Sequence, residues 1–143
     1  ETFSHDIACN MDGVTEVEGG TYALMGTIYG FMEKFAIANK VLSTIISKPD
    51  DKTAIGDVGF RGLSWMKDNL PSVEGYDNIR VKTLLEDHIV LESDDTMPLE
   101  IGQQFVVLPY YQDIMVNRWD DFIVVRNGVV EDVWDIPGRG GFH

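Results

Sequence analysis

The chain has 143 residues, of which 11 are basic and 24 acidic, so its formal net charge is −13 at pH 7. No stretch gathers Lys and Arg into a patch that could neutralise phosphates, so we expect no nucleic-acid or membrane partner. Hydrophobic residues make up 44% of the sequence, as in an ordinary globular protein. The acidic balance indicates a soluble surface, with an acidic docking face for a basic partner as the alternative.

Cys9 is the only cysteine, which excludes an internal disulfide and a zinc site built on several thiolates. A reducing, cytoplasmic setting fits this composition. The chain begins ETFSHDIACN without Met, and we expect Glu1 to be a boundary within a longer polypeptide. Residues 1–13 show no hydrophobic period. We expect this initial segment to be anchored only by the chain that precedes it, and so to be frayed here.

The first half of the chain contains three predicted strands. The first is Thr21–Thr27, set off by two glycines, and the second is Ala38–Ser47, ended by Pro49. Residues 31–47 could also form one face of a helix, but their β-branched side chains favour a strand. The third is Lys52–Asp57.

The second half contains more strand signals. Asn78–Leu85 alternates polar with apolar residues, which is typical of a half-buried strand. Asn127-Gly128 predicts a hairpin between the last two of the remaining strands, which are His88–Glu92, Gln104–Leu108, Asp121–Arg126 and Val129–Trp134. Between the strands we expect a turn or short helix at Gly59–Asn69, a loop at Pro71–Tyr76 and a surface loop at Ser93–Pro98.

These elements predict a mostly β fold: an antiparallel sandwich or partly open barrel of about eight strands with one or two short helices. There is no alternation of strands and helices and no internal repeat. We expect residues 1–143 to form a single β domain, since the length suits one core.

Few residues suggest catalysis by themselves. His88 is the one credible site histidine, since His5 and His143 lie near the chain ends, and it could equally cap a strand. No nucleophile elbow, zinc-protease motif or phosphate-binding loop is present. Gly138–Gly141 reads as a flexible exit rather than a phosphate cradle.

Asp113 is the carboxylate most suggestive of function. It lies among aromatic and aliphatic residues just after an apolar strand, where a bare charge is costly unless it is paired or bound to a metal. The paired acidic residues elsewhere are typical of solvated loops.

Six segments in order resemble a known family: Val14–Tyr22, Val41–Pro49, Ile55–Ser64, Leu85–His88, Leu108–Asn117 and Phe122–Arg139. They are similar to the C-terminal domain of D-threonine aldolases and eukaryotic-type D-serine dehydratases. Those are fold-type III pyridoxal-phosphate (PLP) enzymes related to alanine racemase. The resemblance implies that this chain is the C-terminal β domain of a two-domain enzyme.

In such an enzyme an N-terminal α/β barrel holds PLP as a Schiff base, the β domain closes the site, and the parent is usually a homodimer acting on a small D-amino acid. The resemblance therefore implies that the PLP lysine belongs to the absent barrel and that this chain alone does not bind PLP. The lysines here all fall in segments that resemble the β domain: Lys34, Lys40, Lys48, Lys52, Lys67 and Lys82.

The family's divalent metal, such as zinc, is bound by a Pro-x-His-x-Cys or Pro-x-His-x-Asp element. Here the matching stretch is Pro109–Asp113, in which Asp113 stands at the ligand position and Tyr111 replaces the His. A neutral phenol is a poor ligand compared with imidazole. Either the metal is lost, which would favour racemisation or another elimination over aldol cleavage, or His88 supplies the missing nitrogen.

Tyr22 and Tyr111 are the remaining pocket candidates, because each hydroxyl falls in a family-matching segment. Asp57 and Arg61 are candidates for a charged pair near the site. The leading hypothesis is a β domain that supplies substrate-side residues to an absent PLP-binding barrel. The alternatives are a non-enzymatic subunit that pairs with a separate barrel chain and a stand-alone β barrel that binds a metal or ligand.

Overall fold

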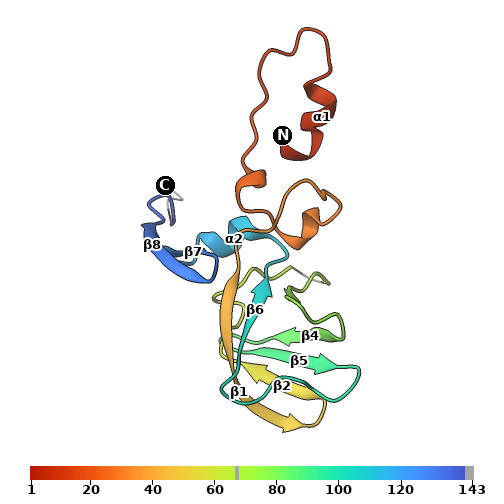
Figure 1. The fold of residues 1–143 in the computed structure, drawn as a ribbon, viewed down its shortest axis with the longest axis vertical. Helices are drawn as coiled ribbons and strands as arrows, with labels where there is room; N and C mark the ends of the chain where they lie inside the picture. Colours follow the sequence, from red (N-terminus) through yellow and green to blue (C-terminus); the bar gives the residue numbers. More distant parts are fainter. Residues whose placement is uncertain (67, 141–143) are drawn as a thin grey trace.

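The computed structural model describes residues 1–66 and 68–140 (Figure 1). In chain order its elements are η1 (Thr2–Ser4), α1 (His5–Ala8), η2 (Thr21–Ala23), η3 (Thr27–Tyr29), β1 (Val41–Asp50), β2 (Thr53–Gly56), β3 (Ser72–Val73), β4 (Ile79–Leu84), β5 (Ile89–Ser93), β6 (Gln104–Leu108), α2 (Gln112–Val116), β7 (Asp121–Arg126) and β8 (Val129–Asp135). The prediction of a mostly β fold with about eight strands is confirmed. Of the two predicted architectures the structure adopts the barrel, which is closed.

Six strands form the antiparallel barrel in the order β1-β2-β5-β4-β3-β6. The pairing of β1 with β6, from Val41↔Val107 to Thr44↔Gln104, closes it. β3 lies in the segment predicted to be a loop, and it joins β4 to β6. The sequence does not predict β3 because two residues are too few to show a strand period.

Alternate residues of the barrel strands fill the closed core. Ile89 and Leu91 of β5 and Phe105 and Val107 of β6 are all buried. Gly56 faces the same interior, where a Cβ would lie 2.6 Å from the Phe105 ring and 2.7 Å from Ile89. A larger residue would overpack this position, so the barrel is filled by its own side chains.

Strand β1 confirms the strand interpretation of Ala38–Ser47 over the helical one. It also runs through Pro49, where the sequence predicts its end. The register between β1 and β2 shifts between Ser47 and Asp50, so Pro49 lies where the ladder is already irregular and no N–H is required. The other predicted strands after β1 match the observed ones with ends that agree within one residue.

The predicted strand Thr21–Thr27 is wrong. Its first residues form η2, and Met25 has a φ of +58°. The N–H of Met25 donates to the Thr21 carbonyl (2.9 Å) and that of Thr27 to the Pro109 carbonyl (2.9 Å). Turn and inter-segment hydrogen bonds therefore take backbone groups that a sheet would use.

The predicted surface loop Ser93–Pro98 is only partly exposed. Met97 lies in the barrel core, and its N–H donates to the carbonyl of Asp51 (2.7 Å). A methionine adapts readily to an irregular gap, so it can anchor a polar loop from inside. Gly59–Asn69 forms turns over its described residues, as predicted, and Lys67 lies outside them.

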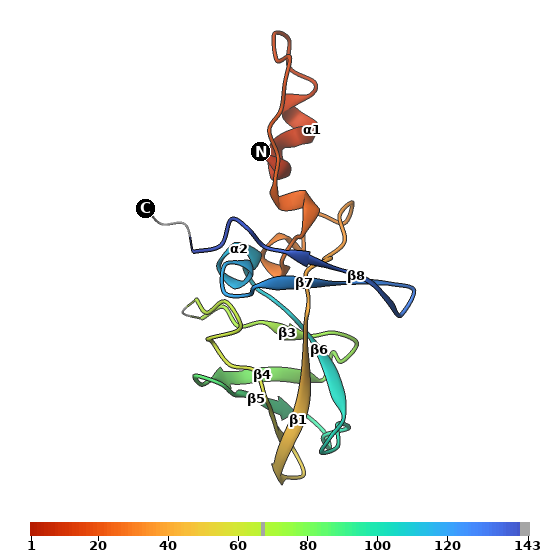
Figure 2. The same ribbon diagram turned by 90° about the vertical axis from the view of Figure 1, so that its left-hand side faces the viewer.

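β7 and β8 form the hairpin predicted from Asn127-Gly128. These two residues have φ values of +52° and +77°, as a two-residue turn of type I′ requires. The hairpin is a separate two-stranded sheet outside the barrel, and Figure 2 shows its tip projecting past the barrel strands.

The N-terminal segment projects from the end of the barrel that also carries α2, with α1 far from the strands (Figures 1 and 2). The initial segment, residues 1–13, contains η1 and α1. None of the helices in the described part of the chain has the length and apolarity that a bilayer crossing needs.

Candidate functional site

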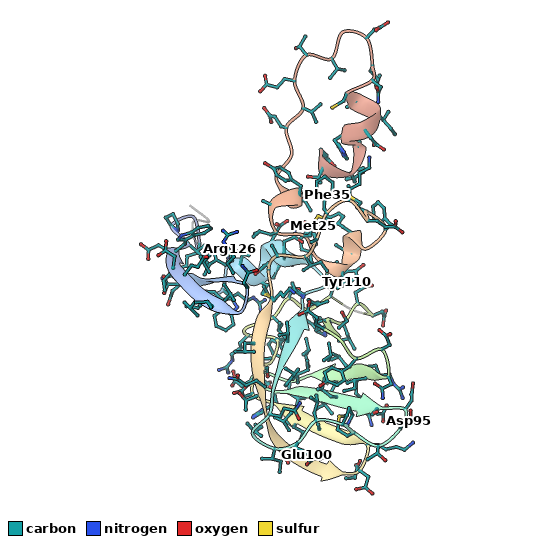
Figure 3. All side chains as sticks on the ribbon, viewed as in Figure 1. Met25, Phe35, Asp95, Glu100, Tyr110 and Arg126 are labelled. Carbon is teal, nitrogen blue, oxygen red and sulfur yellow. The ribbon has the colours of Figure 1, made fainter. Side chains whose placement is uncertain are left out.

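The segment Pro109–Asp113 follows β6 and includes the first two residues of α2, at the end of the barrel that meets the N-terminal segment. Figure 3 labels Tyr110 at this junction. The Pro109 carbonyl accepts a hydrogen bond from the N–H of Thr27 (2.9 Å), and the Tyr110 carbonyl accepts one from Ile28 (3.1 Å). Two backbone hydrogen bonds thus hold η3 against the segment that carries the family motif.

Tyr111 and Asp113 form a hydrogen-bonded pair, in which the phenol donates to the carboxylate. This hydrogen bond, with the negative charge of Asp113, raises the pKa of Tyr111 above its ordinary value of 10.0, and burial and Tyr29 raise it further. Tyr111 is therefore a neutral donor at physiological pH. Its backbone N–H donates to Ser64 Oγ (3.3 Å), and Gln112 Nε2 donates to Asp113 Oδ1 (3.3 Å).

Next to this pair, the backbone at Gly26 comes close to Gln112, the residue between Tyr111 and Asp113. Gln112 is buried, and its Oε1 has no hydrogen-bond partner among the described residues. A Cβ on Gly26 would lie 2.8 Å from that oxygen and 2.7 Å from the Tyr110 carbonyl oxygen. Only glycine allows this approach, so Gly26 sets the distance between η3 and the motif.

The motif does not fit the divalent metal that the family resemblance implies. Asp113 already accepts hydrogen bonds from Tyr111 and Gln112, and a neutral phenol replaces the imidazole. His88 is exposed in the turn between β4 and β5, where its carbonyl accepts the N–H of Leu85 (2.8 Å). Over residues 1–66 and 68–140, no three His, Cys, Asp or Glu side chains are grouped to hold a metal ion.

Tyr22 lies in a different neighbourhood from Tyr111. Its ring packs against Phe35, with 6.2 Å between the ring centroids. It lines a cavity of about 270 Å³ together with Thr2 and Cys9 of the initial segment. The structure thus places Tyr22 with the N-terminal segment.

Asp57 and Arg61 each have a different ionic or hydrogen-bonding partner. Asp57 accepts hydrogen bonds from Ser43 Oγ (2.9 Å) and from the N–H of Thr44 (2.8 Å). Arg61 pairs with Asp87, at 3.3 Å between Nη1 and Oδ2. Asp57 therefore ties β2 to β1, and Arg61 contacts the turn that contains His88.

The described lysines have acidic side chains or a backbone carbonyl as neighbours. Lys34 lines a cavity of about 320 Å³ with Asp6 and Glu33, whose charges would repel a phosphate. The amines of the other described lysines have partners. Lys40 pairs with Glu74, Lys48 with Glu100 and Lys82 with Glu92, and Lys52 donates a hydrogen bond to the Asp94 carbonyl. Lys67 and His143 lie outside the described residues, as does Gly141, the last residue of the flexible segment predicted at Gly138–Gly141.

Sequence reasoning does not single out Gly26, Tyr29, Ser64 or Gln112. The contacts of Gly26 and Tyr29 depend on η3 lying against Pro109–Asp113, whereas the sequence predicts a strand ending at Thr27. The one available signal is that Ser64 and Gln112 fall within segments that resemble the family.

Known proteins are similar to this chain in sequence and in fold. The chain is 31% identical to a D-threonine aldolase from Arthrobacter sp over 88% of this chain and 35% of that protein. It is 28% identical to the 3-hydroxy-D-aspartate aldolase from Paracoccus denitrificans over 97% of this chain and 38% of that protein. The chain spans little more than a third of the length of these relatives.

Solved structures agree. The crystal structure of D-threonine aldolase from Filomicrobium marinum matches 98% of this chain and 39% of its own, with a TM-score of 0.88 at 26% identity. D-threo-3-hydroxyaspartate dehydratase from Delftia sp. HT23 shares the fold, with a TM-score of 0.71 at 21% identity over 87% of this chain and 39% of its own.

The model of one family, described as "Putative serine dehydratase domain", matches residues 38–125, more than half of the chain. These residues include the whole barrel, α2 and most of β7. The chain therefore belongs to the serine dehydratase domain family.

Proposed function

We propose that this chain is the C-terminal β domain of a PLP-dependent amino-acid aldolase, dehydratase or racemase. The observation that carries the proposal is an asymmetry of coverage: 88% of the chain matches only 35% of a D-threonine aldolase at 31% identity. The PLP-binding α/β barrel then lies outside these 143 residues. The lysines with bound amines and the acidic cavity at Lys34 support this assignment of PLP binding to the barrel.

The contribution of this chain is a polar surface for a small D-amino acid substrate. Tyr111 is partly exposed and Asp113 is exposed, so both can be reached from outside the barrel. The Tyr111 hydroxyl is a neutral donor, and the Asp113 carboxylate retains acceptor capacity beside it. Together they would orient the substrate's hydroxyl group and exchange a proton with it, in the position where the family motif has a metal.

Two accompanying features stay predictions. The parent enzyme is expected to be a homodimer, and its location is expected to be cytoplasmic. Tyr22 remains a second candidate for contact with substrate or cofactor, since its hydroxyl lies in a family-matching segment and its side chain is exposed.

A PLP titration tests the proposal. The 143-residue chain is titrated with PLP and followed by the absorbance change that accompanies covalent capture by a lysine, then supplied with D-threonine. We expect neither capture nor turnover by this chain, and both by the complete polypeptide encoded by its gene. Turnover of D-threonine by the 143-residue chain alone would contradict the proposal.

Metal dependence separately tests the role proposed for Tyr111 and Asp113 in contacting the substrate. In the complete polypeptide we expect turnover to survive removal of divalent metal by a chelator and to fall at least about tenfold on Tyr111→Phe. Tyr110→Phe is the matched control and should leave turnover within about twofold. A chelator-sensitive enzyme that is indifferent to Tyr111→Phe would show that a metal, and not this pair, serves the substrate.

A further inference from the structure

One face of the β7–β8 hairpin is aliphatic and open to solvent. The register pairs Ile123 with Val133 and Val125 with Val130, with one irregularity between these pairs, and residues directly paired across an antiparallel ladder lie on the same face. All four side chains are 54–60% exposed. This set is called the hairpin face below.

In the barrel, by contrast, one side of each strand faces the closed core. An isolated two-stranded sheet is marginally stable in water, since it buries too little apolar surface on either side. Four aliphatic side chains open together on one face are characteristic of a contact surface rather than of a solvated one.

The hairpin is nevertheless fixed at its base. The N–H of Ile136 donates to the Asp120 carbonyl (2.8 Å), and Arg139 pairs with the Asp120 carboxylate. The N–H of Gly140 donates to Asn117 Oδ1 (2.7 Å), just after α2. The hairpin face is therefore presented in a set orientation next to the helix that begins with the family motif.

We propose that the hairpin face is the docking surface for the part of the parent polypeptide that lies outside this chain. This inference rests on the proposed function, because it requires that such a part exists. D-threonine aldolase from Filomicrobium marinum matches 98% of this chain, so the hairpin belongs to the shared structure, and 61% of that protein lies outside the match. A longer polypeptide thus supplies enough chain to cover the face.

Charge favours this occupant over a second copy of the chain. Asp121 and Asp135 are paired across the strands at one end of the hairpin face. The whole chain carries a net charge of −13, so two copies meeting face to face would bring acidic groups together. The expected occupant offers aliphatic side chains opposite the four residues and a Lys or Arg near the acidic end.

Hydrogen exchange of the backbone amides of β7 and β8 tests this assignment. The isolated 143-residue chain is compared at low concentration with the complete polypeptide encoded by its gene. We expect the hairpin amides to exchange about 100-fold more slowly in the complete polypeptide, while the amides of β4 and β5 keep similar protection in both. Equal exchange of the hairpin amides in both samples would overturn the proposal.

Two variants of the complete polypeptide locate the contact. Ile123→Lys/Val133→Lys should abolish the added protection of the hairpin amides, while protected β4 and β5 amides report an intact barrel. Ile101→Lys is the matched control, because Ile101 is as exposed and follows Glu100, which Figure 3 labels at the far end of the barrel. An Ile101→Lys variant that loses hairpin protection as fully as the double variant would remove the assignment to this face.

The same samples separate failure of docking from failure of the proposed function. PLP capture by a complete polypeptide with unprotected hairpin amides would overturn docking and leave the proposed function standing. Protected amides without PLP capture would do the reverse. Protection that appears when the isolated chain is concentrated would make a second copy the occupant and would also overturn the proposal.

Discussion

The barrel and the hairpin are built from strands with similar sequences and opposite surroundings. In β5, Ile89 and Leu91 alternate with partly exposed residues and are completely buried. In β7, Ile123 and Val125 occupy the same alternating positions and are more than half exposed. The period of two thus identifies a strand, but a strand is stabilised by burial only where the chain supplies a second layer to cover it.

The test of this contrast with the largest expected effect truncates one aliphatic side chain in the barrel and one in the hairpin. Leu91→Ala should lower the free energy of unfolding by about 2–5 kcal/mol, because it leaves a cavity in a closed core. Ile123→Ala should lower it by less than about 0.5 kcal/mol, since the side chain is largely in water. Denaturant unfolding of the 143-residue chain measures both. Equal losses would mean that the hairpin is covered within this chain.

A second test addresses the contact between η3 and the motif. Gly26→Ala should cost about 1–3 kcal/mol, because the new methyl group meets the Tyr110 carbonyl oxygen and Gln112 Oε1. Gly20→Ala is the matched control, since a Cβ there meets nothing within 4 Å, and it should change stability by less than about 0.5 kcal/mol. If thermal unfolding showed the two variants to be alike, η3 would not be seated on Pro109–Asp113.

A third test reads the Tyr111–Asp113 pair directly. Asp113→Asn should lower the pKa of Tyr111 towards 10.0, because the charged acceptor that stabilises the neutral phenol is lost. A raised pKa in the folded state adds stability that is present below pH 10 and lost as pH rises through the raised value, so the variant should lose that alkaline decline. Absorbance titration of phenolate measures the change.

Two further variants identify the titrating group. Tyr111→Phe should remove the titration that Asp113→Asn shifts, whereas Tyr110→Phe should leave it in place. A titration curve that Asp113→Asn does not alter would contradict the hydrogen bond between these side chains.

The smallest expected effect concerns the acidic end of the hairpin. Desolvation, then the hydrogen bond with Asp135 and its charge, raise the pKa of Asp121. Protonated Asp121 therefore favours the folded hairpin below the ordinary pKa of 3.8, and this contribution is lost as pH rises through the raised value. Asp135→Asn should lower the pKa of Asp121, as measured by carboxyl NMR titration. An unchanged Asp121 titration would show that the two carboxyls are apart.

Local patterns predict most of the barrel and part of the site. Asn127-Gly128 predicts the hairpin, because both residues tolerate the positive φ that its turn requires. The family-like stretch Pro109–Asp113 brings Tyr111 and Asp113 to notice, two positions apart. The role of Gly26 is not predictable in this way, because the largely apolar segment TYALMGT favours a strand and its partner is a segment more than 80 residues away.

By itself the sequence determined the strand periods, the hairpin turn, the absence of a disulfide and the family motif with Tyr111 in place of an imidazole. Those features depend on neighbouring residues or on composition. Only the tertiary structure decided that β3 joins β4 to β6 in the closed barrel, that η2 and η3 replace a strand, and that the hairpin face stays uncovered in this chain. Each of these depends on hydrogen bonds and burial between segments distant in sequence, and no local pattern encodes which distant surface is present to complete them.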